Sequence, residues 1–138
     1  MHWHAYTWTG AGEERGWEPE RRPDSPEFPS SPLPPMLTGD WLAKPRSRIA
    51  ATFTELQPAL EWLSARYERA RAGFPRPDGI GADLRLAAAR DVLPRGVDVQ
   101  WGEWLRDGRF VTIGMICCPN RHVRHPCPLG RSAYPDPR

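Results

Sequence analysis

The chain has 138 residues, of which 39% are hydrophobic and 17 are prolines, so we expect one small core and a part that does not pack. The 19 basic and 17 acidic residues leave a net charge of only +2, which excludes the strong positive field of proteins that bind nucleic acid mainly by charge. No apolar run approaches the roughly 20 residues needed to cross a bilayer, which excludes a membrane-spanning helix.

Two further features concern the cellular context. Residues 1–6 have neither the charged nor the apolar region of a secretory signal, so we expect a cytoplasmic protein. In that compartment thiols stay reduced, and clustered cysteines bind metal more often than they form disulfides. Lys44 is the only lysine among the 19 basic residues, a bias that we attribute to a GC-rich bacterial genome.

The first 36 residues divide into two segments. Residues 1–10 begin with alternating aromatic side chains, which is typical of a short strand. Residues 11–36, the proline-rich segment, contain seven prolines, which remove backbone donors and fix φ. We interpret this segment as a flexible linker with polyproline character. The alternative is a ligand for an aromatic-lined groove, since Pro32 and Pro35 form a P-x-x-P motif.

Two helices are predicted downstream of a strand at residues 48–53. The first begins near Thr54, where Thr-Glu-Leu-Gln fits a capping box, and ends before Gly73. Its apolar positions fall on one face at helical spacing: Leu56, Leu60, Leu63 and Tyr67. The second helix covers residues 83–92. Its expected inward residues are Leu84, Ala87, Ala88 and Val92.

The clearest element is a hairpin formed by residues 97–105 and 110–118. Asp107-Gly108 between them is a preferred two-residue turn, and counting back from it pairs Trp101 with Gly114. The elements together predict an α+β fold. We expect a small two-layer domain over residues 37–118, with two helices packed on an antiparallel sheet that contains the C-terminal β-hairpin.

The C-terminal segment, residues 119–138, is rich in Cys, His and Pro and follows directly on two cysteines. Sulfur and imidazole donors at this density suit a tetrahedral zinc ion. The candidate metal ligands are Cys118, His122, His125 and Cys127. The alternative is ordinary surface histidines and partly buried thiols, because structural sites usually join two close pairs across a longer loop. His2 and His4 share one strand face and would complete a site if that strand lay beside Cys118.

The same segment allows two other functions. Arg121 and His122 would lower the pKa of the Cys118 thiol, which suggests a thiol-dependent enzyme using Cys118 with a nearby histidine. No oxyanion-hole glycine motif accompanies it, so we assign no catalytic residue. A candidate binding surface for single-stranded nucleic acid combines aromatic and basic residues: Trp101, Trp104, Arg121 and Arg124.

The function that the sequence favours is a small non-enzymatic intracellular binding module. Its C-terminal Cys/His cluster would hold a metal ion, with zinc as the expected cofactor, or form the contact surface. A protein partner is favoured over nucleic acid, and no membrane partner is expected.

Overall fold

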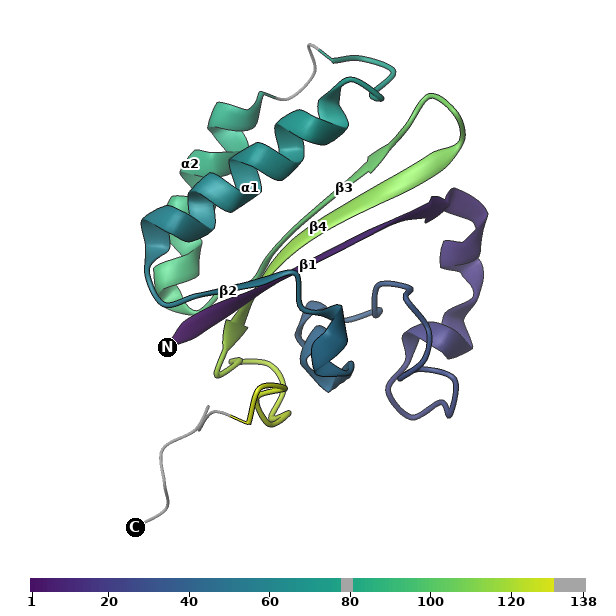
Figure 1. The fold of residues 1–138 in the computed structure, drawn as a ribbon, viewed down its shortest axis with the longest axis vertical. Helices are drawn as coiled ribbons and strands as arrows, with labels where there is room; N and C mark the ends of the chain where they lie inside the picture. The colour runs from purple at the N-terminus through teal and green to yellow at the C-terminus, as the bar shows by residue number, and fades with distance from the viewer. Residues whose placement is uncertain (78–80, 131–138) are drawn as a thin grey trace.

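A computed structural model of the chain describes residues 1–77 and 81–130. One antiparallel sheet has the strand order β2-β1-β4-β3. The strands are β1 (His2–Ala11), β2 (Ala51–Phe53), β3 (Val99–Trp104) and β4 (Arg109–Cys118). The α-helices α1 (Leu56–Arg71) and α2 (Ala82–Val92) lie on one side of the sheet (Figure 1). This arrangement confirms the predicted α+β fold with its C-terminal hairpin.

Short 3-10 helices make up the rest of the helical structure. They are η1 (Gly12–Gly16), η2 (Glu18–Arg21), η3 (Thr38–Ala43), η4 (Arg46–Arg48) and η5 (Leu93–Arg95). The segment that contains η1 to η4 lies on the side of the sheet away from α1 and α2 (Figure 1). Within the described part of the chain, no helix combines the length and apolar character needed to span a membrane.

Helix α1 has the predicted apolar face but a different start. Leu60, Leu63 and Tyr67 are buried against the sheet, as their spacing predicts. The helix begins at Leu56 with Glu55 as its N-cap, and the N-cap side chain makes no capping hydrogen bond. The capping box expected at Thr54 is therefore not formed. The N-cap is one residue later than expected, and Pro58 still lies in the first turn, where its missing N–H costs nothing.

Helix α2 presents a different face from the one predicted. Ala89 is buried, while Leu84 is 71% exposed and Ala87 and Ala88 are also exposed. Of the expected inward residues, only Val92 packs against the core. The error has a simple cause: α2 carries alanines and leucines around most of its circumference, so its sequence does not distinguish one apolar stripe from its neighbour.

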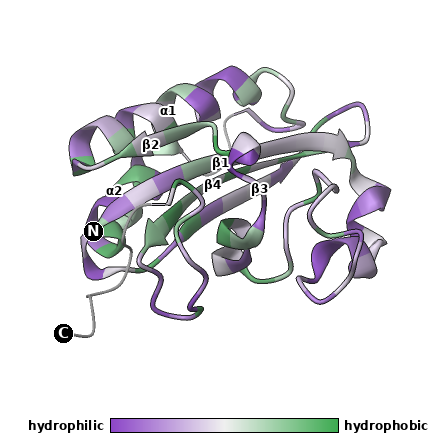
Figure 2. Cartoon of the chain, turned by 60° about the horizontal axis from the view of Figure 1, so that its bottom comes forward, coloured by the Kyte–Doolittle hydropathy of each residue, from purple (hydrophilic) through white to green (hydrophobic). Residues whose placement is uncertain are grey.

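The sheet is buried on both faces. Val111, Ile113 and Met115 of β4 point toward the helices, and the alternate residues of the same strand point away from them. The second face packs against η3, where the Trp41 ring stacks on Tyr6 with ring centroids 4.8 Å apart. Figure 2 shows hydrophobic residues along β4 and hydrophilic ones on the outward turns of α1. Two cores, one on each side of the sheet, therefore hold this fold together.

The proline-rich segment contributes Leu33 to the second core, and Phe28 is buried as well. Phe28 and Leu33 are each only 1% exposed, so the segment is packed against the fold and does not extend away from it as a linker. Proline has no backbone N–H, so the segment has fewer backbone donors than carbonyl acceptors. Side chains from outside the segment donate to some of these carbonyl oxygens. Lys44 Nζ donates to the carbonyl oxygens of Phe28 (2.7 Å) and Ser31 (2.8 Å). These hydrogen bonds hold in place a segment that forms no strand pairing beyond Ala11.

Lys44 provides a test of this packing. Lys44→Met would leave two buried carbonyl groups without their donor, and we expect a loss of about 2–3 kcal/mol in the free energy of unfolding.

The same substitution tests the protonation of Lys44. Burial, and next the nearby Arg48, lower the pKa of Lys44 from 10.5 to about 8. Between these values the unfolded chain binds more protons than the folded one, so parent stability should rise with pH relative to the variant. Urea unfolding of both proteins below and within this window measures the difference. If the difference in the free energy of unfolding between parent and variant did not change with pH, the lowered pKa of Lys44 would be contradicted.

The hairpin β3–β4 is present, but its register differs from the predicted one by one residue. Trp101 pairs with Ile113, and Gln100 takes the predicted place of Trp101 opposite Gly114. The loop has three residues, not two, because the Leu105 N–H donates to the Arg109 carbonyl (2.8 Å). Asp-Gly suits both loop lengths. The shift turns Trp101 to the helix side of the sheet, where its ring meets Tyr67 edge-on.

The three-residue loop depends on Gly108, whose φ is +82°. Gly108→Val should lower the free energy of unfolding by about 1–2 kcal/mol, because a side chain is strained in the left-handed region. Gly16→Val is the matched control, since Gly16 is not at positive φ and a Cβ there would meet nothing within 4 Å. Thermal melting measures both. Equal melting temperatures for the two variants would contradict the observed turn.

Candidate metal centre

Four side chains that commonly bind metal ions meet on the second face of the sheet. They are His2, His4, Cys118 and Cys127, called here the four-donor cluster. One potential ligand atom from each lies within 4.8 Å of the other three, and all four residues are buried. The cluster could therefore hold a metal ion.

The contacts within the cluster are short. The Nε2 atoms of His2 and His4 are 3.1 Å apart. The Sγ atom of Cys127 is 3.5 Å from the first of these nitrogens and 3.4 Å from the second. The two imidazole nitrogens and the sulfur thus face a common point, and Cys118 joins them from the end of β4.

Strand pairing places three of the four donors. His2 and His4 are two residues apart on β1, so their side chains project from the same face of the sheet. His2 is paired directly with Cys118 on β4, and paired residues of an antiparallel ladder present their side chains on one face. The register between β1 and β4 therefore assembles His2, His4 and Cys118 without any loop geometry.

Cys127 is brought to the cluster by the turn that follows β4. The Asn120 side-chain amide donates to both carboxylate oxygens of Asp98, at 2.9 and 3.0 Å. Farther along, His125 Nε2 lies 2.8 Å from the Asp40 carboxylate. These two contacts fold residues 119–127 back beneath the second face of the sheet, so that Cys127 lies against the two histidines.

A hydroxyl group orients one of the imidazoles. His4 Nδ1 lies 2.8 Å from Thr52 Oγ1, and these residues are paired on β1 and β2. When Nδ1 donates its proton to that oxygen, the lone pair of Nε2 is left for a metal ion. Partners of this kind commonly fix the tautomer and ring orientation of metal-binding histidines. The short strand β2 thus supplies a supporting contact for the cluster.

Tyr6 adds an uncharged neighbour to the cluster. Its side chain is fully buried, and its hydroxyl makes no hydrogen bond with any described residue. Burial, followed by the proximity of Cys118 and Cys127, holds the pKa of Tyr6 well above its usual range. The phenol therefore stays protonated and adds no negative charge beside the two sulfur atoms.

Cys117 has a different environment from Cys118, although the two are adjacent. It projects to the helix side of the sheet, where it is fully buried. Burial, and next the Asp98 carboxylate, raise the pKa of the Cys117 thiol to about 12. Cys117 is thus a core side chain with little thiolate character at neutral pH.

The structure brings together two of the four metal ligands proposed from the sequence. Cys118 and Cys127 lie in the four-donor cluster, but His122 and His125 do not belong to it. His122 is exposed, and the His125 ring is bonded to Asp40. Their places are taken by His2 and His4. The sequence predicts that these two histidines complete a site if their strand lies beside Cys118, and β1 does pair with β4 at that residue.

The candidate nucleic-acid surface is not gathered in one place. Trp101 is 7% exposed and lies in the helix-side core, whereas Trp104 is 51% exposed. Trp104 pairs with Phe110 near the start of β4, while Arg121 and Arg124 follow the opposite end of that strand. Trp104 is therefore separated from the two arginines by the length of β4, and Trp101 is buried beside the middle of that strand.

Comparison with known proteins gives no further indication of function: the chain matches no family model, no curated protein and no solved structure.

Proposed function

We propose that the protein is a small non-enzymatic binding module whose fold is stabilised by one zinc ion in the four-donor cluster. The observation that carries this proposal is the set of donor separations. Tetrahedral zinc, with Zn–N of about 2.0–2.1 Å and Zn–S of about 2.3 Å, separates two nitrogens by about 3.3 Å and a nitrogen from a sulfur by about 3.6 Å. The nitrogen pair of His2 and His4 is 3.1 Å apart, and the Cys127 sulfur lies 3.5 and 3.4 Å from these two nitrogens.

The type of donor favours zinc among the metals. Two imidazoles and two thiolates are a standard ligand set for tetrahedral zinc. A Rieske iron–sulfur centre also uses two histidines and two cysteines, but it places the cysteines on one iron and the histidines on the other. Cys127 lies as close to both histidines as one shared ion requires, which supports a single metal ion.

The closed surroundings favour a structural role for the metal. A catalytic zinc has three protein ligands and an open position, whereas all four residues of this cluster are buried side chains that could bind. A thiol-dependent enzyme has less support. Cys118 is 0% exposed, and neither His122 nor His125 belongs to its cluster. We further propose a cytoplasmic location, where thiols stay reduced, and a protein partner.

The proposal is tested by native mass spectrometry of the purified chain. We expect one zinc ion per chain, and a loss of that ion in Cys127→Ser. Cys117→Ser is the matched control, because Cys117 lies on the opposite face and should leave the metal content unchanged. Absence of metal from the folded parent protein would contradict the proposal. Rapid alkylation of Cys118 in the native protein would instead favour the thiol enzyme.

A further inference from the structure

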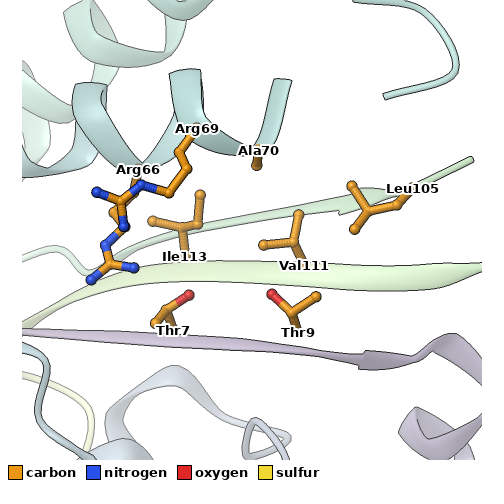
Figure 3. Close-up of a pocket in the computed structure, with 8 residues that line it drawn as sticks. All are labelled: Thr7, Thr9, Arg66, Arg69, Ala70, Leu105, Val111 and Ile113. Atoms are coloured by element: carbon orange, nitrogen blue, oxygen red, sulfur yellow. The ribbon is translucent and has the colours of Figure 1, made fainter. Parts of the chain in front are cut away.

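A cavity of about 200 Å³ lies between α1 and the sheet (Figure 3). The four-donor cluster lies on the other face of the sheet. The origin of the cavity is the difference in length between two neighbouring strands. β2 pairs only with residues 3–5 of β1, so the later part of β1, including Thr7 and Thr9, has no strand neighbour on that side among the described residues. Helix α1 continues over this part of the sheet, and the space beneath it is open to solvent.

One part of the cavity is apolar. Val111 and Ile113, which are 6% and 3% exposed, project from β4 toward α1 and form its floor. Ala70 of α1 and Leu105 lie toward one end, away from the charged side chains in Figure 3. Apolar cavities of about 150 Å³ can hold a benzene ring, so this volume is sufficient for one aromatic ring or a short aliphatic chain.

The other part of the cavity carries two positive charges. Arg66 and Arg69 extend from α1, and their guanidinium groups project toward the Thr7 end in Figure 3. Neither forms an ion pair with any carboxylate of the described residues. The acidic neighbour Glu68 is bonded to Arg71 instead, at 2.9 Å. No acidic residue is among those that line the cavity.

We propose that this cavity binds a small carboxylate with an apolar body. The apolar part would pack on Val111 and Ile113, and the carboxylate would accept hydrogen bonds from Arg66 and Arg69. Guanidinium groups are well suited to this because their fork of N–H donors matches both oxygens of a carboxylate. The walls select an apolar body and the arginine pair selects a negative charge. This inference does not depend on the zinc proposal, because cavity and cluster lie on opposite faces of the sheet.

The probe for this site is 3-phenylpropionate, compared with its uncharged amide. In a titration followed by NMR, we expect saturable shifts of the Val111 and Ile113 methyl signals, with affinity in the millimolar range. The amide has the same ring and chain but no charge, so it should bind about tenfold or more weakly. The titration uses the full chain as purified.

Substitution of the two arginines tests whether their positive charges bind the carboxylate. Arg66→Gln and Arg69→Gln should each weaken binding of 3-phenylpropionate about tenfold. Arg95→Gln removes the same charge from an exposed arginine paired with Asp91 and should leave the affinity unchanged. Unchanged melting temperatures would show that the variants are folded. The proposal is overturned if the methyl signals do not shift, if the amide binds equally well, or if the shifts are confined to His2 and His4.

Discussion

Removal of zinc should lower the melting temperature of the protein by about 10–15 °C, the shift expected for a domain of this size that loses about 4 kcal/mol of ligand stabilisation. A metal that binds only the folded state contributes this energy directly to folding, because the unfolded chain has no preformed site. The effect should be large here because the four donors join both ends of the described fold. His2 opens β1, and Cys127 lies near the end of the described residues.

The measurement is a thermal melt with and without a zinc chelator. In Cys127→Ser the chelator should have little effect, because the ion is already lost. In Cys117→Ser the chelator should still lower the melting temperature, even if the core substitution lowers the starting value. A parent protein that melts at the same temperature with and without the chelator would contradict a structural role for the metal.

Phe28→Ala should lower the free energy of unfolding by about 3–5 kcal/mol, the usual cost of removing a buried phenylalanine. Phe28 is 1% exposed, and the Lys44 ammonium group lies 3.8 Å from the centre of its ring. A cavity at this position would also disturb the carbonyl group to which Lys44 donates. This is a large effect for a residue in the middle of a proline-rich stretch.

Leu37→Ala is the matched control for that substitution, because Leu37 follows the same segment but is 63% exposed. It should change stability by less than about 0.5 kcal/mol. Urea unfolding of the two variants gives the comparison. If Phe28→Ala were as stable as Leu37→Ala, Phe28 would not be packed, and the proline-rich segment would be the flexible linker that its composition suggests.

The contrast at the proline-rich segment shows what composition can and cannot predict. Seven prolines correctly exclude an α-helix within this segment, in which the only helices are the short 3-10 helices η1 and η2. They do not determine whether the segment packs, because that depends on apolar side chains such as Phe28 and Leu33 and on donors elsewhere in the chain. Lys44, the donor to this segment, is far enough along the sequence that no local pattern connects the two.

Local sequence patterns predicted which helices and strands form better than they predicted the register in which the strands pair. The apolar stripe of α1 is strong, so its buried face was predictable, as was the hairpin around Asp107-Gly108. The hairpin register was not, because the same turn residues fit loops of two and three residues. A shift of one residue reverses which face each β3 side chain occupies, and Trp101 moved to the helix side for this reason.

The candidate metal centre was only partly predictable for a related reason. The spacing of Cys118 and Cys127 with two nearby histidines suggested a site wrapped within ten residues. The fold instead assembles its donors across β1 and β4, and strand pairing between distant segments is not visible in local spacing. The one sequence signal that pointed to the observed cluster was His2 and His4 at alternate positions of the first strand.

The most direct test of the zinc proposal is X-ray absorption spectroscopy of the purified protein at the zinc edge. Two nitrogen ligands at about 2.0–2.1 Å and two sulfur ligands at about 2.3 Å are expected, matching His2, His4, Cys118 and Cys127. Cys127→Ser should lose zinc or show one sulfur fewer. A parent spectrum with only nitrogen and oxygen ligands would contradict the proposal, because it would show zinc bound somewhere other than the four-donor cluster.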